Sequence, residues 1–292
     1  MQQHFGGDWT AEKLSKLKSY LTAYTTALKK TPFTLVYIDA FAGTGYRNIK
    51  SPDDRQTLIL PDQAGGDAEA FHAGSARIAL ETDPRFSEYY FIEQDQDKCA
   101  ELEKLRTEFP DKSKDIHVLN EDSNTAIERI CNRFRKDGKL RGVIFLDPFG
   151  MNVAWRTVEV IASTKAIDMW YLFPFGVGVN RLLTKDGNIP EAWQKRLDDI
   201  FGEPDWRGIF YSKTKTLDLF GSVKEQVVKT GDFEDIKKYI VKRLKETFAG
   251  VADKPSPLYN SRKNPLYLLC FAAGNEKGAP IAVRIAGHIL KG

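Results

Sequence analysis

Short apolar runs alternate with stretches of helical period in this chain, and the alternation constrains the fold more than any other feature. The apolar runs are rich in β-branched and aromatic residues, which favours strands. The predicted strands cover residues 35–38, 89–93, 116–119, 142–146 and 169–173, and the helices between them cover residues 97–108, 123–134 and 154–163. Strands that alternate with helices in this way form a parallel sheet covered on both faces. The sequence therefore predicts an α/β fold with a doubly wound, mostly parallel, Rossmann-like sheet.

Additional elements flank this core. An N-terminal helix precedes the first strand, because apolar residues recur there at steps of three and four: Leu14, Leu17, Leu21, Tyr24 and Leu28. Residues 180–250 are interpreted as a mostly helical insertion before the last strand, which we place at residues 265–272 and follow with a helix at 279–290. Although 292 residues exceed the commonest domain size, α/β domains of this length often have one core. We expect a single domain over residues 1–292.

Residues 48–74 interrupt the pattern directly after the first strand. They are rich in Pro, Asp, Gly and Gln and show no sustained period. Loops of this length inside compact domains are either functional or disordered. We predict a lid-like insertion here, and the disordered alternative remains open.

Composition excludes several classes of protein. The formal net charge of +3 is too small to predict nucleic-acid binding, which a concentrated basic patch would signal. Cys99, Cys131 and Cys270 are too widely spaced to indicate a disulfide framework or a metal site. There is no signal-peptide pattern and no run of 18 apolar residues. We therefore expect a cytoplasmic protein with no membrane association.

A glycine-rich turn follows the first predicted strand, with the sequence Asp39-Ala40-Phe41-Ala42-Gly43-Thr44-Gly45. Glycines at the end of a strand let backbone N–H groups approach a ligand. The residues that we expect to bind a nucleoside cofactor here are Asp39, Phe41, Ala42, Gly43 and Gly45. The dinucleotide fingerprint would need glycine at position 48, where this chain has Asn48, so a nicotinamide cofactor is disfavoured. An ordinary tight turn is the alternative.

Two further acids follow predicted strands. Glu93 ends the second strand, where a carboxylate can accept hydrogen bonds from both ribose hydroxyls of a cofactor. Asp122 follows the third strand, where it could hold an adenine amino group. Acids in these positions are also ordinary helix N-caps. Cofactor binding and helix capping are thus both open for Glu93 and Asp122.

The segment Asp147-Pro148-Phe149-Gly150 follows the fourth predicted strand and is the catalytic candidate. Doubly wound sheets place their ligands beyond the carboxyl ends of the strands. For methyl transfer to an exocyclic amine, a carboxylate and a carbonyl next to proline can accept the hydrogens of the amine, while an aromatic ring stacks on the base. Asp147, Pro148 and Phe149 supply these groups in order. A plain turn that uses Pro and Gly is the alternative.

These blocks resemble the three-Cys-motif partner protein family, known as TcmP. The resemblance rests on residues 37–45, Gly74-Ser75, residues 91–93 and residues 145–150, and it continues nearly from end to end. It implies a class I methyltransferase-like fold with S-adenosylmethionine as cofactor. It also implies a partner, a radical-S-adenosylmethionine-type protein that carries the three-cysteine motif.

The first half is also similar to a family of ribosomal-RNA adenine-N6 methyltransferases. The Asp147 block departs from the D-P-P-Y pattern of that family, with Phe149 at the second proline and Gly150 at the aromatic position. We predict an S-adenosylmethionine-dependent methyltransferase that acts on a nucleic-acid base of RNA or DNA, of the adenine amine type. The alternative is a cofactor-binding partner subunit without turnover of its own. An adenine-nucleotide or nicotinamide enzyme is a third class.

Overall fold

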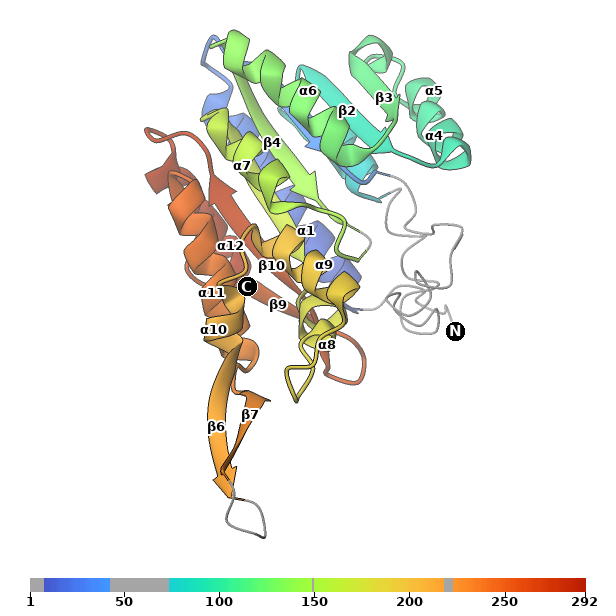
Figure 1. The fold of residues 1–292 in the computed structure, drawn as a ribbon. Helices are drawn as coiled ribbons and strands as arrows, with labels where there is room; N and C mark the ends of the chain where they lie inside the picture. The colour runs from blue at the N-terminus through green and yellow to red at the C-terminus, as the bar shows by residue number, and fades with distance from the viewer. Residues whose placement is uncertain (1–7, 43–73, 149, 218–222) are drawn as a thin grey trace.

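The computed structural model describes residues 8–42, 74–148, 150–217 and 223–292 (Figure 1). Almost all of the predicted lid, residues 48–74, lies outside the described residues. The described part begins with a long helix, α1 (Asp8–Leu28), and ends with α12 (Ala279–Lys291). No helix in these ranges is both long and apolar enough to cross a bilayer.

A single large sheet organises the fold, with the strand order β3-β2-β1-β4-β5-β10-β8. Its members are β1 (Thr34–Asp39), β2 (Glu88–Glu93), β3 (Ile116–Asn120), β4 (Leu140–Leu146), β5 (Ile167–Phe173), β8 (Gly250–Val251), β9 (Ser256–Tyr259) and β10 (Pro265–Ala273). Strands β1 to β5 pair in parallel, whereas β10 pairs antiparallel with β5, β8 and β9. The order reverses between β1 and β4, as at the switch point of a doubly wound sheet. The predicted fold class is confirmed.

Helices cover both faces of the sheet (Figure 1). One face carries α1, α12, a helix over residues 74–81, α4 (Gln96–Glu103) and α5 (Leu105–Glu108). The other carries α6 (Ser123–Lys136), α7 (Trp155–Ser163), α9 (Glu191–Phe201), α10 (Trp206–Phe210) and α11 (Phe233–Thr247). Side chains of a strand alternate between the two faces. In β1, Val36 and Ile38 pack on the α6 side, whereas Tyr37 packs on the α1 side. Asp39 therefore points to the α1 side.

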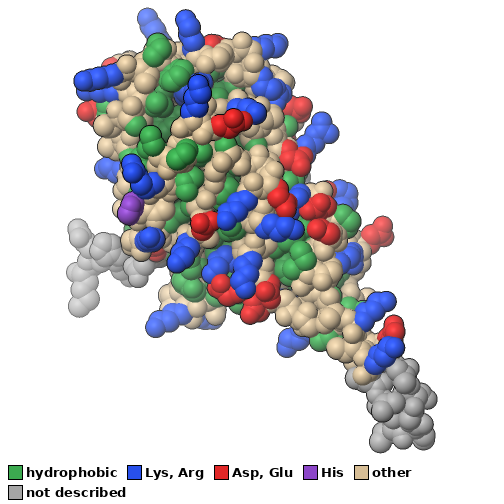
Figure 2. All heavy atoms as spheres, turned by 90° about the vertical axis from the view of Figure 1, so that its left-hand side faces the viewer, with side chains coloured by type: hydrophobic (Ala, Val, Ile, Leu, Met, Phe, Trp, Pro, Cys, Tyr) green, Lys and Arg blue, Asp and Glu red, His purple; other side chains and the backbone are tan. Residues whose placement is uncertain are grey.

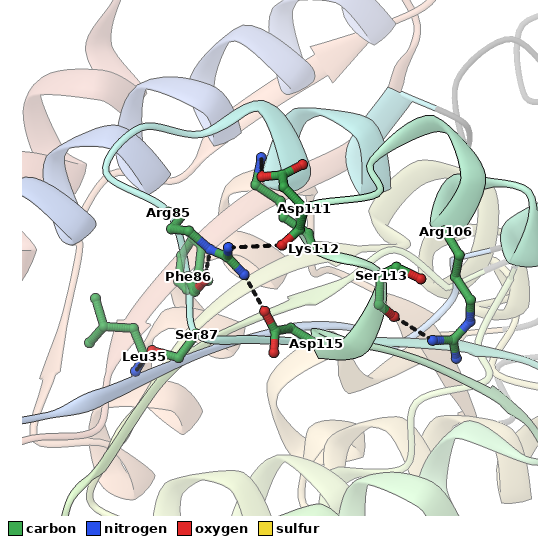
Figure 3. Close-up of polar contacts among 9 residues, drawn as sticks. All are labelled: Leu35, Arg85, Phe86, Ser87, Arg106, Asp111, Lys112, Ser113 and Asp115. Carbon is green, nitrogen blue, oxygen red and sulfur yellow. Dashed lines mark hydrogen bonds and ion pairs between the residues drawn. The ribbon is translucent and has the colours of Figure 1, made fainter.

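Backbone and side-chain contacts hold the start of β2 against its neighbours (Figure 3). Ser87 donates its backbone N–H to the carbonyl of Leu35 at 2.8 Å, and its hydroxyl accepts from the backbone N–H of Leu35 at 3.2 Å. The Arg85 guanidinium donates to the carbonyl of Asp111 at 3.3 Å and pairs with Asp115 just before β3. These contacts lie at the amino ends of β1, β2 and β3, and the parallel pairing of the three strands sets which residues reach the opposite edge of the sheet.

Residues 180–250 contain helices α8 (Asn180–Leu182), α9, α10 and α11, and α11 packs into the main core. They also contain a β-hairpin that the sequence did not predict. Its strands, β6 (Tyr211–Leu217) and β7 (Val223–Lys229), extend away from the sheet as an arm (Figure 1). The period-two pattern of a half-buried strand is missing because Ser212, Lys213, Thr214 and Lys215 are all exposed.

Candidate site at the carboxyl edge of the sheet

Three predicted acids lie at the carboxyl ends of neighbouring strands, beside the point where the strand order reverses. Asp39 ends β1, Glu93 ends β2 and Asp147 directly follows β4. The register aligns Asp39 with Phe91 of β2 and with Phe145 of β4. Glu93 and Asp147 therefore lie two residues further toward the carboxyl edge than Asp39, in the region where open α/β sheets bind their ligands.

The carboxyl group of Asp39 is fully buried and only partly hydrogen-bonded. Its Oδ2 accepts from the Tyr37 hydroxyl at 3.3 Å, whereas its Oδ1 makes no hydrogen bond within the described part of the chain. Burial raises the pKa of Asp39 to about 7 and the Asp147 carboxylate adds to the rise, whereas hydrogen bonds from Ser75, the backbone N–H of Phe41 and Tyr37 oppose it. A buried carboxylate oxygen without a donor is costly, so this atom suits a ligand that brings a donor or a positive charge.

Asp147 lies where the sequence predicts it, but it has a partner that the sequence did not reveal. The ammonium of Lys13, from α1, donates to Asp147 Oδ2 at 2.8 Å. Lys13 is 1% exposed and Asp147 is 7% exposed, so the pair is buried. The ammonium also lies over the rings of Trp9, at 4.9 Å, and Phe145, at 5.9 Å. Desolvation lowers the pKa of Lys13 to about 8, although Asp147 and Asp39 oppose the shift.

The sequence does contain a signal for this lysine. Lys13 lies four residues before Leu17 and eight before Leu21, both of which are buried on the apolar stripe of α1. Residues at such spacings share one face of a helix. A lysine on the buried stripe needs a partner, because lysine is almost never fully buried unpaired. The apolar stripe thus predicts that the ammonium of Lys13 is buried, although it does not show which acid pairs with it.

The residues after β1 bridge its two neighbouring strands. Ala40 donates its N–H to the carbonyl of Phe145 at 3.1 Å, and Ala42 donates to the carbonyl of Ile92 at 2.9 Å. Ala42 is buried on the α1 side of the sheet, whereas the partly buried Phe41 packs against the opposite core. Gly43 and Gly45 lie outside the described residues. Their contact with a cofactor stays a prediction.

Glu93 is half-buried, and its Oε1 accepts from the backbone N–H of Asp95 at 2.8 Å. Asp95, in turn, caps α4 by accepting from the N–H groups of Asp97 and Lys98. Asp122 is exposed and caps α6, with Oδ1 accepting from the N–H of Thr125 at 3.1 Å. Helix capping is therefore the observed role of Asp95 and Asp122. Ribose binding by Glu93 and adenine binding by Asp122 stay predictions.

Two of the three remaining residues of the Asp147 block are described. Pro148 is buried, and Phe149 lies outside the described residues. Gly150 has a φ of +70°, a left-handed conformation that side chains other than glycine rarely adopt. This backbone explains why glycine stands where the D-P-P-Y pattern has an aromatic residue.

Comparison with known proteins yields distant likenesses only. No family model and no curated protein matches the chain, so the TcmP resemblance stays an expectation. Among solved structures, protein LPL1258 from Legionella pneumophila is 15% identical, with a TM-score of 0.38 over 84% of this chain and 94% of that one.

Two similar structures are described as methyltransferases. Magnesium protoporphyrin IX methyltransferase from Synechocystis with bound S-adenosylhomocysteine is 13% identical, with a TM-score of 0.32 over 75% of this chain and 84% of that one. A putative methyltransferase from Escherichia coli is 11% identical, with a TM-score of 0.29 over 72% of this chain and 84% of that one. At these values the likenesses say nothing about ligand or substrate.

Proposed function

We propose that this protein is an S-adenosylmethionine-dependent methyltransferase that acts on a nucleic-acid base, of the adenine amine type. One observation carries the proposal: Asp39, Glu93 and Asp147 stand at the carboxyl ends of three strands around the switch point of a doubly wound sheet. A buried carboxylate oxygen of Asp39 has no donor there within the described ranges.

The described residues fit this cofactor. S-adenosylmethionine supplies an electrophilic methyl group on a positively charged sulfur. Asp39 offers negative charge and an unpartnered oxygen, and Glu93 stands half-buried at the next strand end, where it can accept from ribose hydroxyls. Asp122 would contact the adenine, and the backbone around Phe41 and Ala42 would line the ligand.

The acceptor amine would be aimed by Asp147, the carbonyl of Pro148 and the ring of Phe149. Because the methyl group is already electrophilic, the protein needs mainly to orient the lone pair of the amine and to relieve the positive charge that develops on it. Lys13 holds Oδ2 of Asp147, so we expect the amine to donate to Oδ1. The Asp147 carboxylate, held in place by Lys13, would act by orienting the acceptor amine.

The projecting hairpin supports a nucleic-acid substrate. Lys213 and Lys215 are exposed on one face of β6, on an arm that extends from the body (Figure 1). On the face drawn in Figure 2, Lys and Arg are interspersed with acidic side chains on the body, and an acidic side chain also lies among the basic ones on the arm. The basic helix α11 is similarly paired, since Arg243 contacts Glu203. Phosphate binding needs positive charge that is concentrated in space. The two strands of the arm carry four lysines and one acid, Glu225, which lies opposite Lys215, so they have an excess of positive charge.

The Lys13–Asp147 pair favours a second candidate, a cofactor-binding partner subunit without turnover. A carboxylate that is already neutralised by a buried ammonium is less available to an acceptor amine. In this role the protein would be a partner subunit of a three-Cys-motif, radical-S-adenosylmethionine-type protein and would not modify RNA or DNA.

Two measurements test the proposal. Calorimetry should show binding of S-adenosylhomocysteine and none of NAD. A screen with methyl-labelled S-adenosylmethionine over RNA, DNA and protein should then label a nucleic acid. Binding without transfer to any of the three would favour the partner subunit, and absence of binding would exclude both.

A further inference from the structure

Three ionisable groups from three different elements meet in the core below the carboxyl edge. Lys13 comes from α1, Asp39 ends β1 and Asp147 follows β4. Lys13 and Asp147 are in contact at 2.8 Å, and both Lys13 and Asp147 interact electrostatically with Asp39. We refer to these three residues as the charge cluster.

Among the described residues, the neighbours of the charge cluster do not compensate its charge. The other polar groups in this part of the chain that act on Asp39 or Asp147 are the hydroxyls of Tyr37, Ser75 and Tyr267 and the backbone N–H of Phe41, which are neutral at physiological pH. Two acids and one lysine therefore carry one net negative charge when all are ionised. The raised pKa of Asp39, about 7, means that this carboxyl holds a proton near neutrality unless another positive charge arrives.

We propose that the charge cluster selects ligands by charge, and that it binds the sulfonium cofactor in preference to the thioether product. The inference rests on the proposed function, because it assumes that S-adenosylmethionine binds at this edge. S-adenosylmethionine carries one more positive charge than S-adenosylhomocysteine, at the sulfur that loses the methyl group. In a buried setting, one unit of charge acts over several ångströms with little screening. Methyl transfer would thus remove the charge that holds the cofactor and favour release of the product.

The same electrostatics couples binding to a proton. A cation near Asp39 favours its ionised form, so S-adenosylmethionine should expel a proton near pH 7, whereas the neutral product should not. The preference for the cation should rise from pH 6 to pH 8, as Asp39 loses its proton. Lys13, with its pKa lowered to about 8, strengthens the trend because it begins to lose its charge at the upper end.

Calorimetry with both ligands tests the proposal. Wild type at pH 8 should bind S-adenosylmethionine roughly tenfold more tightly than S-adenosylhomocysteine, which corresponds to about 1.4 kcal/mol. Repeating the titrations at pH 7 in buffers of different ionisation enthalpy measures the released proton without any variant. Asp39→Asn should abolish both the preference and the proton release. Lys13→Met should increase the preference, because two carboxylates then lack their cation.

Two matched controls separate charge selection from general effects. Lys16 is also buried, one turn further along α1, but its ammonium donates to the carbonyls of Ile289 and Leu290 in α12. Lys16→Met should leave the ratio of the two affinities unchanged. Glu93→Gln should weaken both ligands alike, because their ribose is the same.

The outcomes distinguish this inference from the proposed function. If wild type binds both ligands equally at pH 8, the inference is wrong and the proposed function stands. If a preference persists in folded Asp39→Asn, charge selection lies elsewhere and the inference is also wrong. If neither ligand binds, the proposed function fails and the inference fails with it.

Discussion

Two of the polar contacts that helix α1 makes at the sheet tie it to buried acids, one near the carboxyl ends and one near the amino ends of the parallel strands, and they differ in kind. Near the carboxyl edge, the ammonium of Lys13 forms an ion pair with the carboxylate of Asp147. Two turns later, the Tyr20 hydroxyl donates to Asp168 Oδ2 at 2.7 Å, and Asp168 Oδ1 accepts from the N–H of Gly274 at 3.2 Å. A neutral donor is therefore sufficient to tie this helix to a buried acid.

The difference bears on why a charged pair is present near the carboxyl edge. Burying two charges costs several kcal/mol per ion before their attraction repays it, and apolar replacements are often as stable. A hydroxyl would have been the less costly partner, as Tyr20 demonstrates. Our hypothesis is that Lys13 is retained for its charge at the site, whereas Tyr20 serves to dock the helix. The predictions below test this contrast.

The largest expected effect is that of Lys13→Met on stability. It leaves Asp147 buried without its cation, which should lower the free energy of unfolding by about 3 to 5 kcal/mol in urea titrations. The double variant Lys13→Met/Asp147→Leu should recover most of this loss. It should nevertheless fail to transfer methyl groups, because the residue that aims the acceptor is gone. A double variant that is stable and active would reduce the pair to a structural contact.

The second prediction concerns the pH dependence of the Asp168 contact. Burial raises the pKa of Asp168 from 3.8 to about 6, against hydrogen bonds from Tyr20 and Gly274. The folded state thus binds a proton more tightly than the unfolded state, so this residue's contribution to stability falls as pH rises from about 4 to 6. A shift of this size corresponds to roughly 3 kcal/mol. Asp168→Asn should flatten this part of the profile of unfolding free energy against pH, and an unchanged slope would contradict the assignment.

Tyr20→Phe should have a smaller effect. It removes one hydrogen bond to Asp168 and retains that from Gly274, so we expect a loss of about 1 to 3 kcal/mol in the free energy of unfolding. The affinities for S-adenosylmethionine and S-adenosylhomocysteine should stay the same. Altered ligand affinity in a folded Tyr20→Phe protein would contradict the hypothesis that Tyr20 only docks the helix whereas Lys13 serves the ligand site.

The smallest effect on stability is expected for exposed lysines. Replacing both Lys213 and Lys215 with Glu should change the free energy of unfolding by at most about 0.5 kcal/mol. It should weaken RNA or DNA binding and reduce the slope of log affinity against log salt by about 2, if each lysine contacts one phosphate. Lys277→Glu, exposed just before α12, is the matched control and should leave that slope unchanged. Equal slopes for all three proteins would exclude the hairpin as a phosphate-binding arm.

Much of the fold could be predicted because its signals are local. The runs that form β1, β4 and β5 are apolar and continuous, as strands buried on both faces must be. The hairpin β6–β7 could not be predicted in this way, because its strands face solvent and bury no regular apolar side. Such a strand forms because it pairs with its partner strand, and its amino-acid composition gives little indication of this pairing.

Sequence alone determined that Asp39, Glu93 and Asp147 end three strands, since strand ends follow from residue period and turn chemistry within a few positions. Only the tertiary structure decided that Lys13 meets Asp147, 134 positions away, and that Asp39 Oδ1 is left without a donor among the described residues. Both facts depend on how α1 lies across the sheet and on how completely water is removed there. The spacing of apolar residues predicts which face of a helix or strand is buried. The free-energy cost of burying a charge, and the residue that pairs with that charge, depend on the packed core.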